Sequence, residues 1–309
     1  MDIISVVIPF LNEESCIVNF CEYIDAYALN KPYEIEVLFV DDGSTDRTIE
    51  RMSRFLFHNC LRVKIISLSK NFGSHAAIRA GILYSTGNYC TFMGADLQEP
   101  EDMLDVMYNK ITSGYDVVYI EKKTGGTNII NRVFSIGYAS LMRRFAVKNY
   151  GAGGINSLIC NEKIKDYLNA NIELNSSLLL QIVDAGFKNA TISMDYRRRK
   201  AGKSKWTVLK KIKLFIDSFV AFSYAPIRLV SIVGISMSLI GFLFGLGIII
   251  NKLVNPSVPA GYATLASLIL IGFGITNISL GIVAEYLWRT YDAARRRPAF
   301  IVSEIKELK

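Results

Sequence analysis

Two long uncharged segments constrain this chain more than any other feature of its sequence. Residues 229–250 and 261–284 run for 22 and 24 residues without a charged side chain. At a rise of about 1.5 Å per residue, a helix of the shorter length reaches roughly 33 Å, which matches a hydrocarbon core of about 30 Å. Two buried core helices are the other interpretation, but uncharged runs of about 18 residues or more are typical of membrane spans. We therefore predict a two-helix transmembrane hairpin within residues 227–291, followed by a C-terminal tail over residues 292–309.

Positive charge flanks the outer ends of this predicted hairpin. Residues 197–213 hold nine basic residues and no acidic one, and arginines at 289 and 295–297 follow the second uncharged run. The connecting loop, residues 251–260, has one Lys. Because basic residues concentrate on the cytoplasmic side of membranes, we expect an integral protein of the inner or plasma membrane with both termini in the cytoplasm. The N-terminus lacks a basic stretch and its apolar run ends at Pro9, so it does not have the pattern of a signal peptide.

The segment 201–226, ahead of the first uncharged run, has the spacing of an amphipathic helix. One face collects large apolar side chains, namely Trp206, Leu209, Ile212, Ile216 and Phe219. Lysines fall on the other face, a pattern that suits a helix lying in the membrane interface. Packing against a soluble domain is the alternative, and a solvated surface or a nucleic-acid patch is the alternative for the basic charge. The position beside an uncharged run favours anionic lipid, so we expect the bilayer as a partner and no nucleic acid.

Residues 1–120 alternate between strand-like and helix-like segments. β-Branched or aromatic runs predict strands at Ile3–Ile8, Ile35–Val40, Val63–Leu68, Tyr89–Met93 and Asp116–Ile120. Helical spacing predicts helices at Glu14–Ala28, Thr45–Leu56, His75–Tyr84 and Pro100–Ser113. The alternation predicts an α/β domain over residues 1–200, with a mostly parallel, Rossmann-like sheet covered on both faces. Ligands of such sheets bind beyond the carboxyl ends of the strands.

Adjacent carboxylates follow the second predicted strand. Asp41 and Asp42 precede Gly43, and the Ser or Thr that comes next can cap a helix. Capping needs one oxygen, whereas this run supplies three carboxylates through Asp46. The repulsion between Asp41 and Asp42 is tolerated more easily when they contact donors of a ligand, such as a base N–H or a ribose hydroxyl. The run therefore predicts the floor of a polar pocket.

Asp96 and Gln98 follow the fourth predicted strand, two positions apart. In an extended chain they face the same side. Oxygen ligands of this kind suit Mg²⁺ or Mn²⁺, which usually takes one or two carboxylates plus substrate phosphates. On its own, however, this pair is better explained as a helix N-terminus ahead of Pro100.

As an ordered set, these motifs resemble those of the inverting GT-A glycosyltransferases of family two. The matching segments are Ile8-Pro9-Phe10-Leu11-Asn12-Glu13, Val40-Asp41-Asp42-Gly43-Ser44, Asn71-Phe72-Gly73 and Ala95-Asp96-Leu97-Gln98. Two further segments resemble polyprenyl-phosphate sugar transferases, namely the Arg-x-x-Gly-x-Ser-Lys run 199–205 and the C-terminal pattern over residues 285–300. The chain is similar to bactoprenol glucosyltransferases, undecaprenyl-phosphate aminoarabinose transferases and dolichol-phosphate mannose synthases. The resemblance covers nearly the whole chain.

The resemblance implies a role for each residue that matches a motif. The implied nucleotide-binding set is Pro9, Glu13, Asp41, Asp42 and Asp96. The implied ligands of Mg²⁺ or Mn²⁺ are Asp96 and Gln98. The implied acceptor-phosphate set is Lys122, Arg132, Ser135, Ser204 and Lys205. The implied catalytic residues are Asp96, Arg199 and Lys205, of which the two basic ones belong to a loop that closes over the phosphates.

Two departures from the family pattern stand out. The family usually has Asp-x-Asp ahead of Leu-Gln, and the first of these positions is Gly94 here. The aminoarabinose branch is similar in carrying Gly at this place. The family also places an Asp and an Arg in the stretch that reads Gly151-Ala152-Gly153-Gly154-Ile155-Asn156-Ser157 here, which has neither. The second departure puts in doubt the usual acid–base role and the usual shape of the sugar pocket.

The predicted activity is the inverting transfer of a hexose, glucose-like or modified, from a UDP-sugar to undecaprenyl or another polyprenyl phosphate. The second pKa of an acceptor phosphate is about 6, so its attacking oxygen is already ionised at neutral pH and needs little general-base help. The lipid-linked product would serve cell-surface glycan or lipopolysaccharide and O-antigen modification. Similar proteins form homotetramers, so we expect a homo-oligomer, with a tetramer favoured.

Other functions agree less well with the residues. A non-catalytic relative acting as a membrane scaffold is the principal alternative, and Gly94 together with the altered 151–157 stretch favours it. A processive polysaccharide synthase normally carries Gln-x-x-Arg-Trp, but neither Gln98 nor Gln181 begins that motif. A flippase has no use for the nucleotide motifs. A dinucleotide enzyme is disfavoured because no Gly-x-Gly-x-x-Gly follows a strand.

Overall fold

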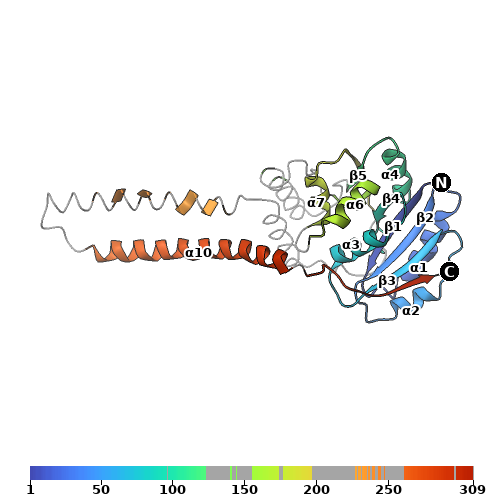
Figure 1. Ribbon diagram of the computed structural model, residues 1–309, viewed down its shortest axis with the longest axis horizontal. Helices are drawn as coiled ribbons and strands as arrows, with labels where there is room; N and C mark the ends of the chain where they lie inside the picture. Colours follow the sequence, from blue (N-terminus) through green and yellow to red (C-terminus); the bar gives the residue numbers. More distant parts are fainter. Residues whose placement is uncertain are drawn as a thin grey trace. The chain divides into compact units, whose positions relative to one another are not determined.

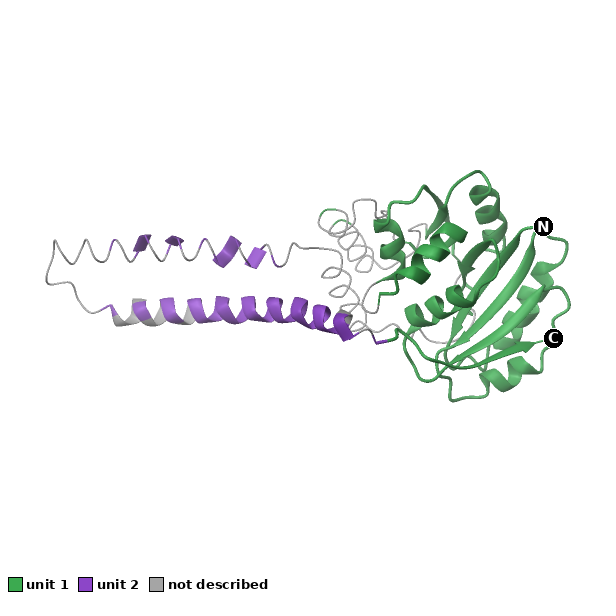
Figure 2. Cartoon of the chain, in the orientation of Figure 1, with its two compact units in different colours: residues 1–218, 298–309 green, residues 219–297 purple. Residues whose placement is uncertain are grey.

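The computed structural model describes residues 1–95, 97–122, 155–173, 177–196, 261–295 and 297–308, with single positions at 140 and 144 and scattered ones between 227 and 247. The chain divides into two compact units (Figure 2). The first comprises residues 1–218 and 298–309, and the second comprises residues 219–297.

The first unit is built on a sheet whose described strands number eight, in the order β7-β5-β6-β4-β1-β2-β3-β8 (Figure 1). The strands are β1 (Ile3–Phe10), β2 (Glu34–Asp41), β3 (Arg62–Leu68), β4 (Tyr89–Phe92), β5 (Val117–Lys122), β6 (Ser157–Asn161), β7 (Asn189–Met194) and β8 (Val302–Leu308). The helices are α1 (Ile17–Ala28), α2 (Thr48–Ser53), α3 (Ser74–Tyr84), α4 (Met103–Ile111), α6 (Glu162–Ala170) and α7 (Leu178–Asp184).

The strand directions bring several carboxyl ends to one edge of the sheet. β1 pairs in parallel with β2 and β4. β6 runs antiparallel to both β4 and β5, so β5 has the same direction as β4, and β7 is parallel to β5. The carboxyl ends of β1, β2, β4, β5 and β7 therefore share an edge. The predicted α/β sheet is confirmed, and its first five strands lie where the sequence placed them.

The alternation of β1 explains how helices cover both faces of the sheet. Its buried residues Ile4, Val6 and Ile8 join one hydrophobic cluster with side chains of α1 and α4. The intervening Val7 faces α3, where a Cβ on Gly81 would lie 2.2 Å from Val7 Cγ1. Each such aliphatic side chain stabilises the fold by about 1.5–3 kcal/mol when buried. A glycine is required here so that α3 can approach β1 closely.

The C-terminal strand β8 was not foreseen from the sequence, which indicated only a tail over these residues. It pairs antiparallel with β3, and the Ser303 hydroxyl donates to the Ser67 carbonyl at 2.9 Å. Five of its seven side chains are exposed, and three of those are charged. Charged residues are common on edge strands because they discourage further strand pairing, and this charge hides the alternation that would otherwise signal a strand.

In the second unit, the described structure is dominated by α10 (Tyr262–Arg295). Its hydroxyl side chains bond back to the preceding turn, as when Thr276 donates to the Gly272 carbonyl at 2.9 Å. Arg289 pairs with Glu285 one turn away at 2.9 Å. Within the described ranges, no helix combines the length and the apolar character that crossing a bilayer requires. The two spans therefore stay a prediction, and the amphipathic segment 201–226 lies outside the described residues.

Candidate active site

The implied nucleotide residues that the structure describes gather at the shared edge of the sheet. Pro9 lies near the end of β1, and its register partner on β2 is Val40, directly ahead of Asp41 and Asp42. Gln98 lies beyond β4, the other neighbour of β1. In sheets of this kind, ligands bind beyond the carboxyl ends of the strands. These residues therefore lie at the edge where a ligand is expected, and their roles stay predictions.

The loop after β1 is held against the loop after β2 by a reciprocal set of hydrogen bonds. The Asn12 N–H donates to Ser44 Oγ at 2.9 Å, and the Thr45 N–H donates to Asn12 Oδ1 at 2.8 Å. The Glu13 N–H donates to Thr48 Oγ1 at 3.0 Å. Asn12 adopts a left-handed conformation with φ 52°, which asparagine tolerates better than most residues. These bonds hold the two loops as one frame around the predicted nucleotide pocket.

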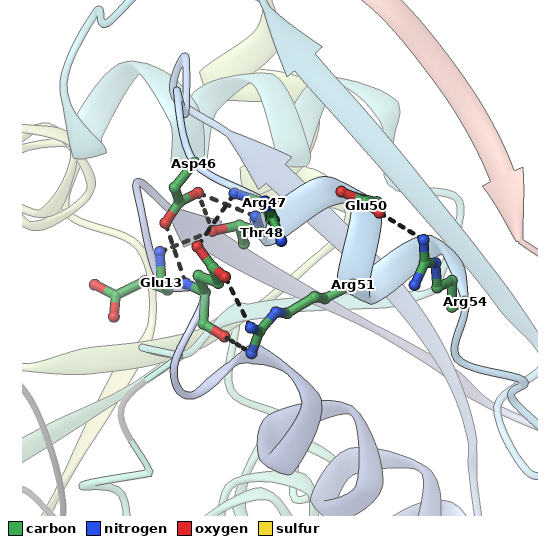
Figure 3. A network of polar contacts seen from close by, with 8 residues as sticks. Glu13, Asp46, Arg47, Thr48, Glu50, Arg51 and Arg54 are labelled. Carbon is green, nitrogen blue, oxygen red and sulfur yellow. Dashed lines mark hydrogen bonds and ion pairs between the residues drawn. The ribbon is translucent and has the colours of Figure 1, made fainter.

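A second layer of contacts supports this frame from α2 (Figure 3). Arg51 forms an ion pair with Glu14 at 2.8 Å, and the Glu14 N–H donates to Asp46 Oδ2 at 3.3 Å. Burial acts to raise the pKa of Asp46, but hydrogen bonds from Thr48 and from the Glu14 N–H outweigh it and hold that pKa below its ordinary value. Asp46 is therefore a structural acceptor here.

Asp41 and Asp42 are both buried, and each carboxylate binds backbone. Asp41 Oδ1 accepts from the Ser44 N–H at 2.9 Å. Asp42 accepts from the Phe72 N–H at 2.7 Å and from the Gly73 N–H at 3.0 Å. Burial, followed by the adjacent charge of Asp41, raises the pKa of Asp42, although the two N–H donors oppose this shift. Asp42 thus joins the end of β2 to the Asn-Phe-Gly motif at the start of α3.

Gly43 is the position where the frame tolerates no side chain. Its φ is +81°, and a Cβ would lie 2.8 Å from the carbonyl carbon of Lys70 and 2.9 Å from the Asn71 nitrogen. Both contacts are with backbone, which cannot rotate away as a flexible side chain could. The Asp-Asp-Gly sequence is therefore explained by a turn that brings the chain after β2 against the chain after β3.

The stretch after β4 is tightly turned. The Gly94 N–H donates to Glu99 Oε1 at 2.8 Å, and Leu97 has a φ of 53°. Asp96, the implied metal and catalytic residue, lies outside the described residues. Among the residues that are described, no group of three or more His, Cys, Asp or Glu side chains could hold a metal. The described part of the predicted metal site is thus the half-buried Gln98, with its amide oxygen.

Lys122 ends β5 at the same edge and faces a residue that the sequence analysis missed. Its ammonium lies 5.7 Å from the centroid of the Tyr196 ring, just beyond β7. The Tyr196 ring packs against the main hydrophobic cluster. Tyr196 directly precedes the basic run that begins at Arg197, which is the signal that could have drawn attention to it. Lys122 and Tyr196 extend the candidate site across the sheet.

The other implied residues lie outside the described part of the chain. They are Arg132, Ser135, Arg199, Ser204 and Lys205, together with the first four residues of the altered 151–157 stretch. The end of that stretch is described. The Asn156 N–H donates to the Ile120 carbonyl at 2.9 Å, and Ser157 begins β6 with its hydroxyl on the Phe92 carbonyl at 2.8 Å. Asn156 and Ser157 thus connect the start of β6 to β5 and β4.

Comparison with known proteins places the chain in a family. The model of the family described as Glycosyl transferase family 2 matches residues 5–167. The uncharacterized glycosyltransferase YkcC of Bacillus subtilis is 32% identical over 303 residues, which cover 97% of this chain and 93% of that protein. The chain therefore belongs to glycosyltransferase family 2 and is an enzyme of the glycosyltransferase class. The resemblance inferred from the ordered motifs is confirmed.

Two further likenesses were found. The undecaprenyl-phosphate 4-deoxy-4-formamido-L-arabinose transferase of Pseudomonas aeruginosa is 28% identical over 314 residues, which cover 99% of this chain and 91% of that protein. Among solved structures, mannosyl-3-phosphoglycerate synthase from Rubrobacter xylanophilus aligns with a TM-score of 0.48 at 12% identity, over 70% of this chain and 71% of that one.

Proposed function

We propose that this glycosyltransferase transfers a hexose from a UDP-sugar to a polyprenyl phosphate, of which undecaprenyl phosphate is the first candidate. The observation that carries the proposal is the frame around Asp41 and Asp42. Two loops and the start of α3 converge on a buried carboxylate pair at the carboxyl edge of the sheet. A relative that matches nearly the whole length of this chain is named for transfer to undecaprenyl phosphate.

At the donor end, the frame would bind the nucleotide. Pro9 and Glu13 would contact the nucleotide from the β1 side, and the aspartates would contact it from the β2 side. Because Asp42 already accepts two backbone N–H groups, its contribution is to hold the loop in place while its remaining lone pairs accept from the ligand. A frame held in this way positions the donor without being reorganised on binding.

The proposal includes a divalent cation that Asp96 and Gln98 would bind. One carboxylate and one amide oxygen, completed by diphosphate oxygens, form the kind of incomplete oxygen set that Mg²⁺ or Mn²⁺ accepts. The presence of Gly94 in place of a second carboxylate leaves more of this coordination to the substrate and water. When bound, the ion neutralises charge on the diphosphate.

At the acceptor end, basic residues would counter the repulsion between two phosphorylated substrates. Lys122 lies at the sheet edge, and the sequence supplies Arg132, Ser135, Arg199, Ser204 and Lys205. In the transfer, an ionised oxygen of the lipid phosphate attacks the anomeric carbon while the bond from that carbon to the diphosphate oxygen breaks and UDP departs. Attack from the face opposite the leaving group inverts the configuration. Fixed cationic donors stabilise the departing diphosphate.

The location also belongs to the proposal. A transmembrane hairpin at residues 227–291 and an amphipathic segment at residues 201–226 would hold the pocket at the cytoplasmic surface of the inner or plasma membrane, where the head group of a long lipid reaches water. The proposed assembly is a homotetramer, and the proposed product supplies cell-surface glycan or lipopolysaccharide modification.

A comparison of three acceptors tests this proposal. The full chain in lipid vesicles is given a UDP-hexose with undecaprenyl phosphate, with undecaprenol or with 3-phosphoglycerate. We expect product from undecaprenyl phosphate alone, with a β-linkage from an α-linked donor. Transfer to the unphosphorylated alcohol or to the water-soluble phosphate would contradict the proposed acceptor, and retained configuration would contradict the proposed inversion. Nucleotide binding without product from any donor would favour the alternative of an inactive scaffold.

A further inference from the structure

Tyr196 lies at the edge of the sheet that carries the candidate site. β7 is parallel to β5, and its last residue, Met194, stands in register with Lys122. Tyr196 follows two positions later and therefore extends beyond the same carboxyl edge. Its ring packs against the hydrophobic cluster, and its face receives the ammonium of Lys122 at 5.7 Å. The packing against the cluster holds the ring in place, and the hydroxyl is the only polar group of this side chain.

The Tyr196 hydroxyl is buried, and among the described residues it has no hydrogen-bond partner. Other tyrosine hydroxyls of this unit are satisfied, since Tyr33 donates to Asp105 at 2.7 Å and Tyr108 donates to Asp2 at 2.9 Å. Leaving a buried polar group without a partner costs about 1–3 kcal/mol. Buried polar groups without a partner are rare in native proteins, so this hydroxyl needs an explanation, and a bound ligand that supplies the partner is one.

The surroundings of the hydroxyl indicate which ligand chemistry it suits. Burial, followed by the negative charge of Glu99, raises the pKa of Tyr196, so the phenol stays protonated and able to donate at neutral pH. Glu99 is held in place by the Gly94 N–H and belongs to the same stretch as Gln98. The ammonium of Lys122 and the carboxylate of Glu99 offset each other beside the phenol, so its hydroxyl suits a neutral acceptor such as a sugar hydroxyl.

We propose that the Tyr196 hydroxyl donates a hydrogen bond to a hydroxyl of the donor's sugar and thereby contributes to the choice of sugar. This inference rests on the proposed function, because it assumes that the sugar of a UDP-sugar lies between the β4 and β7 ends of the edge. A site built to bond a particular hydroxyl discriminates strongly against a sugar that lacks it or presents it at another angle.

The test compares Tyr196→Phe with the matched variant Tyr108→Phe, whose hydroxyl bonds to Asp2 near the opposite edge. UDP-glucose, UDP-galactose, UDP-N-acetylglucosamine and UDP are the probes. For Tyr196→Phe we expect unchanged or higher thermal stability, unchanged affinity for UDP, and about a 10-fold loss of kcat/KM with the donor that the wild type selects. The preference for that donor over the other two should shrink by a similar factor. Tyr108→Phe should lower stability and leave the kinetics unchanged.

Two results would overturn the proposal. One is unchanged discrimination among the three donors in Tyr196→Phe. The other is an increase in the KM for polyprenyl phosphate with no change for the donor, which would assign the hydroxyl to the acceptor instead. Failure of the proposed function can be told apart from failure of this inference, because the wild-type protein itself would then transfer no sugar. Calorimetry of UDP-sugar against UDP still tests the contact in that case, since only the sugar-bearing ligand should bind more weakly to the variant.

Discussion

Asp42 and Gly73, 31 positions apart in the chain, are joined by hydrogen bonds of 3.0 and 3.1 Å from the Gly73 N–H to the two carboxylate oxygens of Asp42. The relationship ties the Asp-Asp-Gly motif to the Asn-Phe-Gly motif, which the sequence offered only as separate family signatures. The Asn-Phe-Gly motif thus has a structural function. Its backbone N–H groups, at the start of α3, stabilise the carboxylate that forms part of the proposed nucleotide pocket.

Replacing Asp42 by Asn should weaken both this junction and nucleotide binding. An amide offers one acceptor oxygen, and its NH₂ group would face N–H donors. We expect the free energy of unfolding to fall by about 1–2 kcal/mol and the affinity for UDP to fall roughly tenfold. Chemical denaturation and calorimetry measure the two quantities. If the free energy of unfolding and the affinity for UDP both stay at the wild-type value, Asp42 neither joins the two motifs nor binds the nucleotide.

Gly43→Ala tests the turn itself. The positive φ alone costs a non-glycine residue about 1–3 kcal/mol, and the backbone of Lys70 and Asn71 obstructs the new methyl group. Gly186→Ala is the matched control, since Gly186 also has a positive φ of 72° but its Cβ would meet nothing nearer than 4.0 Å. We expect Gly43→Ala to lower the thermal midpoint more than Gly186→Ala. Equal losses would show that the backbone contact is unimportant.

The stability of the first unit should depend on pH through Glu36. This fully buried carboxylate accepts from Ser5, from Thr86 and from Lys64. Burial acts to raise the pKa of Glu36, but these donors outweigh it and the pKa lies below the ordinary value of 4.5. Because the folded pKa is depressed, this stabilisation is present above about pH 4.5 and is lost as the pH falls through the folded pKa.

Glu36→Gln should remove that part of the pH dependence and destabilise the fold at pH 7 by about 2 kcal/mol, since Lys64 loses its partner. Denaturation curves from pH 7 down to pH 3 provide the measurement. Glu50→Gln serves as the control, because Glu50 pairs with Arg54 at the exposed surface, where ion pairs contribute about 0–1 kcal/mol. Parallel pH profiles for Glu36→Gln and the wild type would refute this assignment.

Lys122→Ala should act on the acceptor and spare the donor. A charge-assisted hydrogen bond to phosphate contributes about 1.5–3 kcal/mol, so we expect the KM for polyprenyl phosphate to rise about tenfold or more while the KM for the UDP-sugar stays unchanged. Lys110→Ala is the control, since Lys110 is an exposed lysine of α4 that lies over the Tyr115 ring. An increase confined to the donor KM would move Lys122 to the nucleotide side of the site.

The first five strands and the helices between them were predictable from the sequence because runs of β-branched and aromatic residues take turns with segments of helical spacing and are bounded by polar turns. β6 was not, since it lies beyond residue 120, where the predicted alternation of strands and helices ends, and it enters the sheet antiparallel between β4 and β5. β8 was not, because an exposed edge strand needs few apolar residues. In both cases the pairing is set by distant partners and not by the local pattern.

Candidate site residues that carry polar side chains within motifs could be named from the sequence, as Asp41, Asp42 and Gln98 were. Contacts made by the backbone could not, because an N–H group leaves no trace in the sequence. The function of Gly73 as a donor to Asp42 is of this kind. Tyr196 escaped notice because a single aromatic residue is usually part of a core, and only the missing partner of its hydroxyl sets it apart.

The most direct test of the account is sugar transfer from a panel of UDP- and GDP-sugars to undecaprenyl phosphate. It is measured with and without Mg²⁺ or Mn²⁺ for the full chain and for Asp96→Ala. We predict a lipid-linked product from one UDP-sugar, dependent on the metal and lost in the variant. The absence of product from every donor, in a wild-type protein that binds nucleotide, would contradict the proposed transfer.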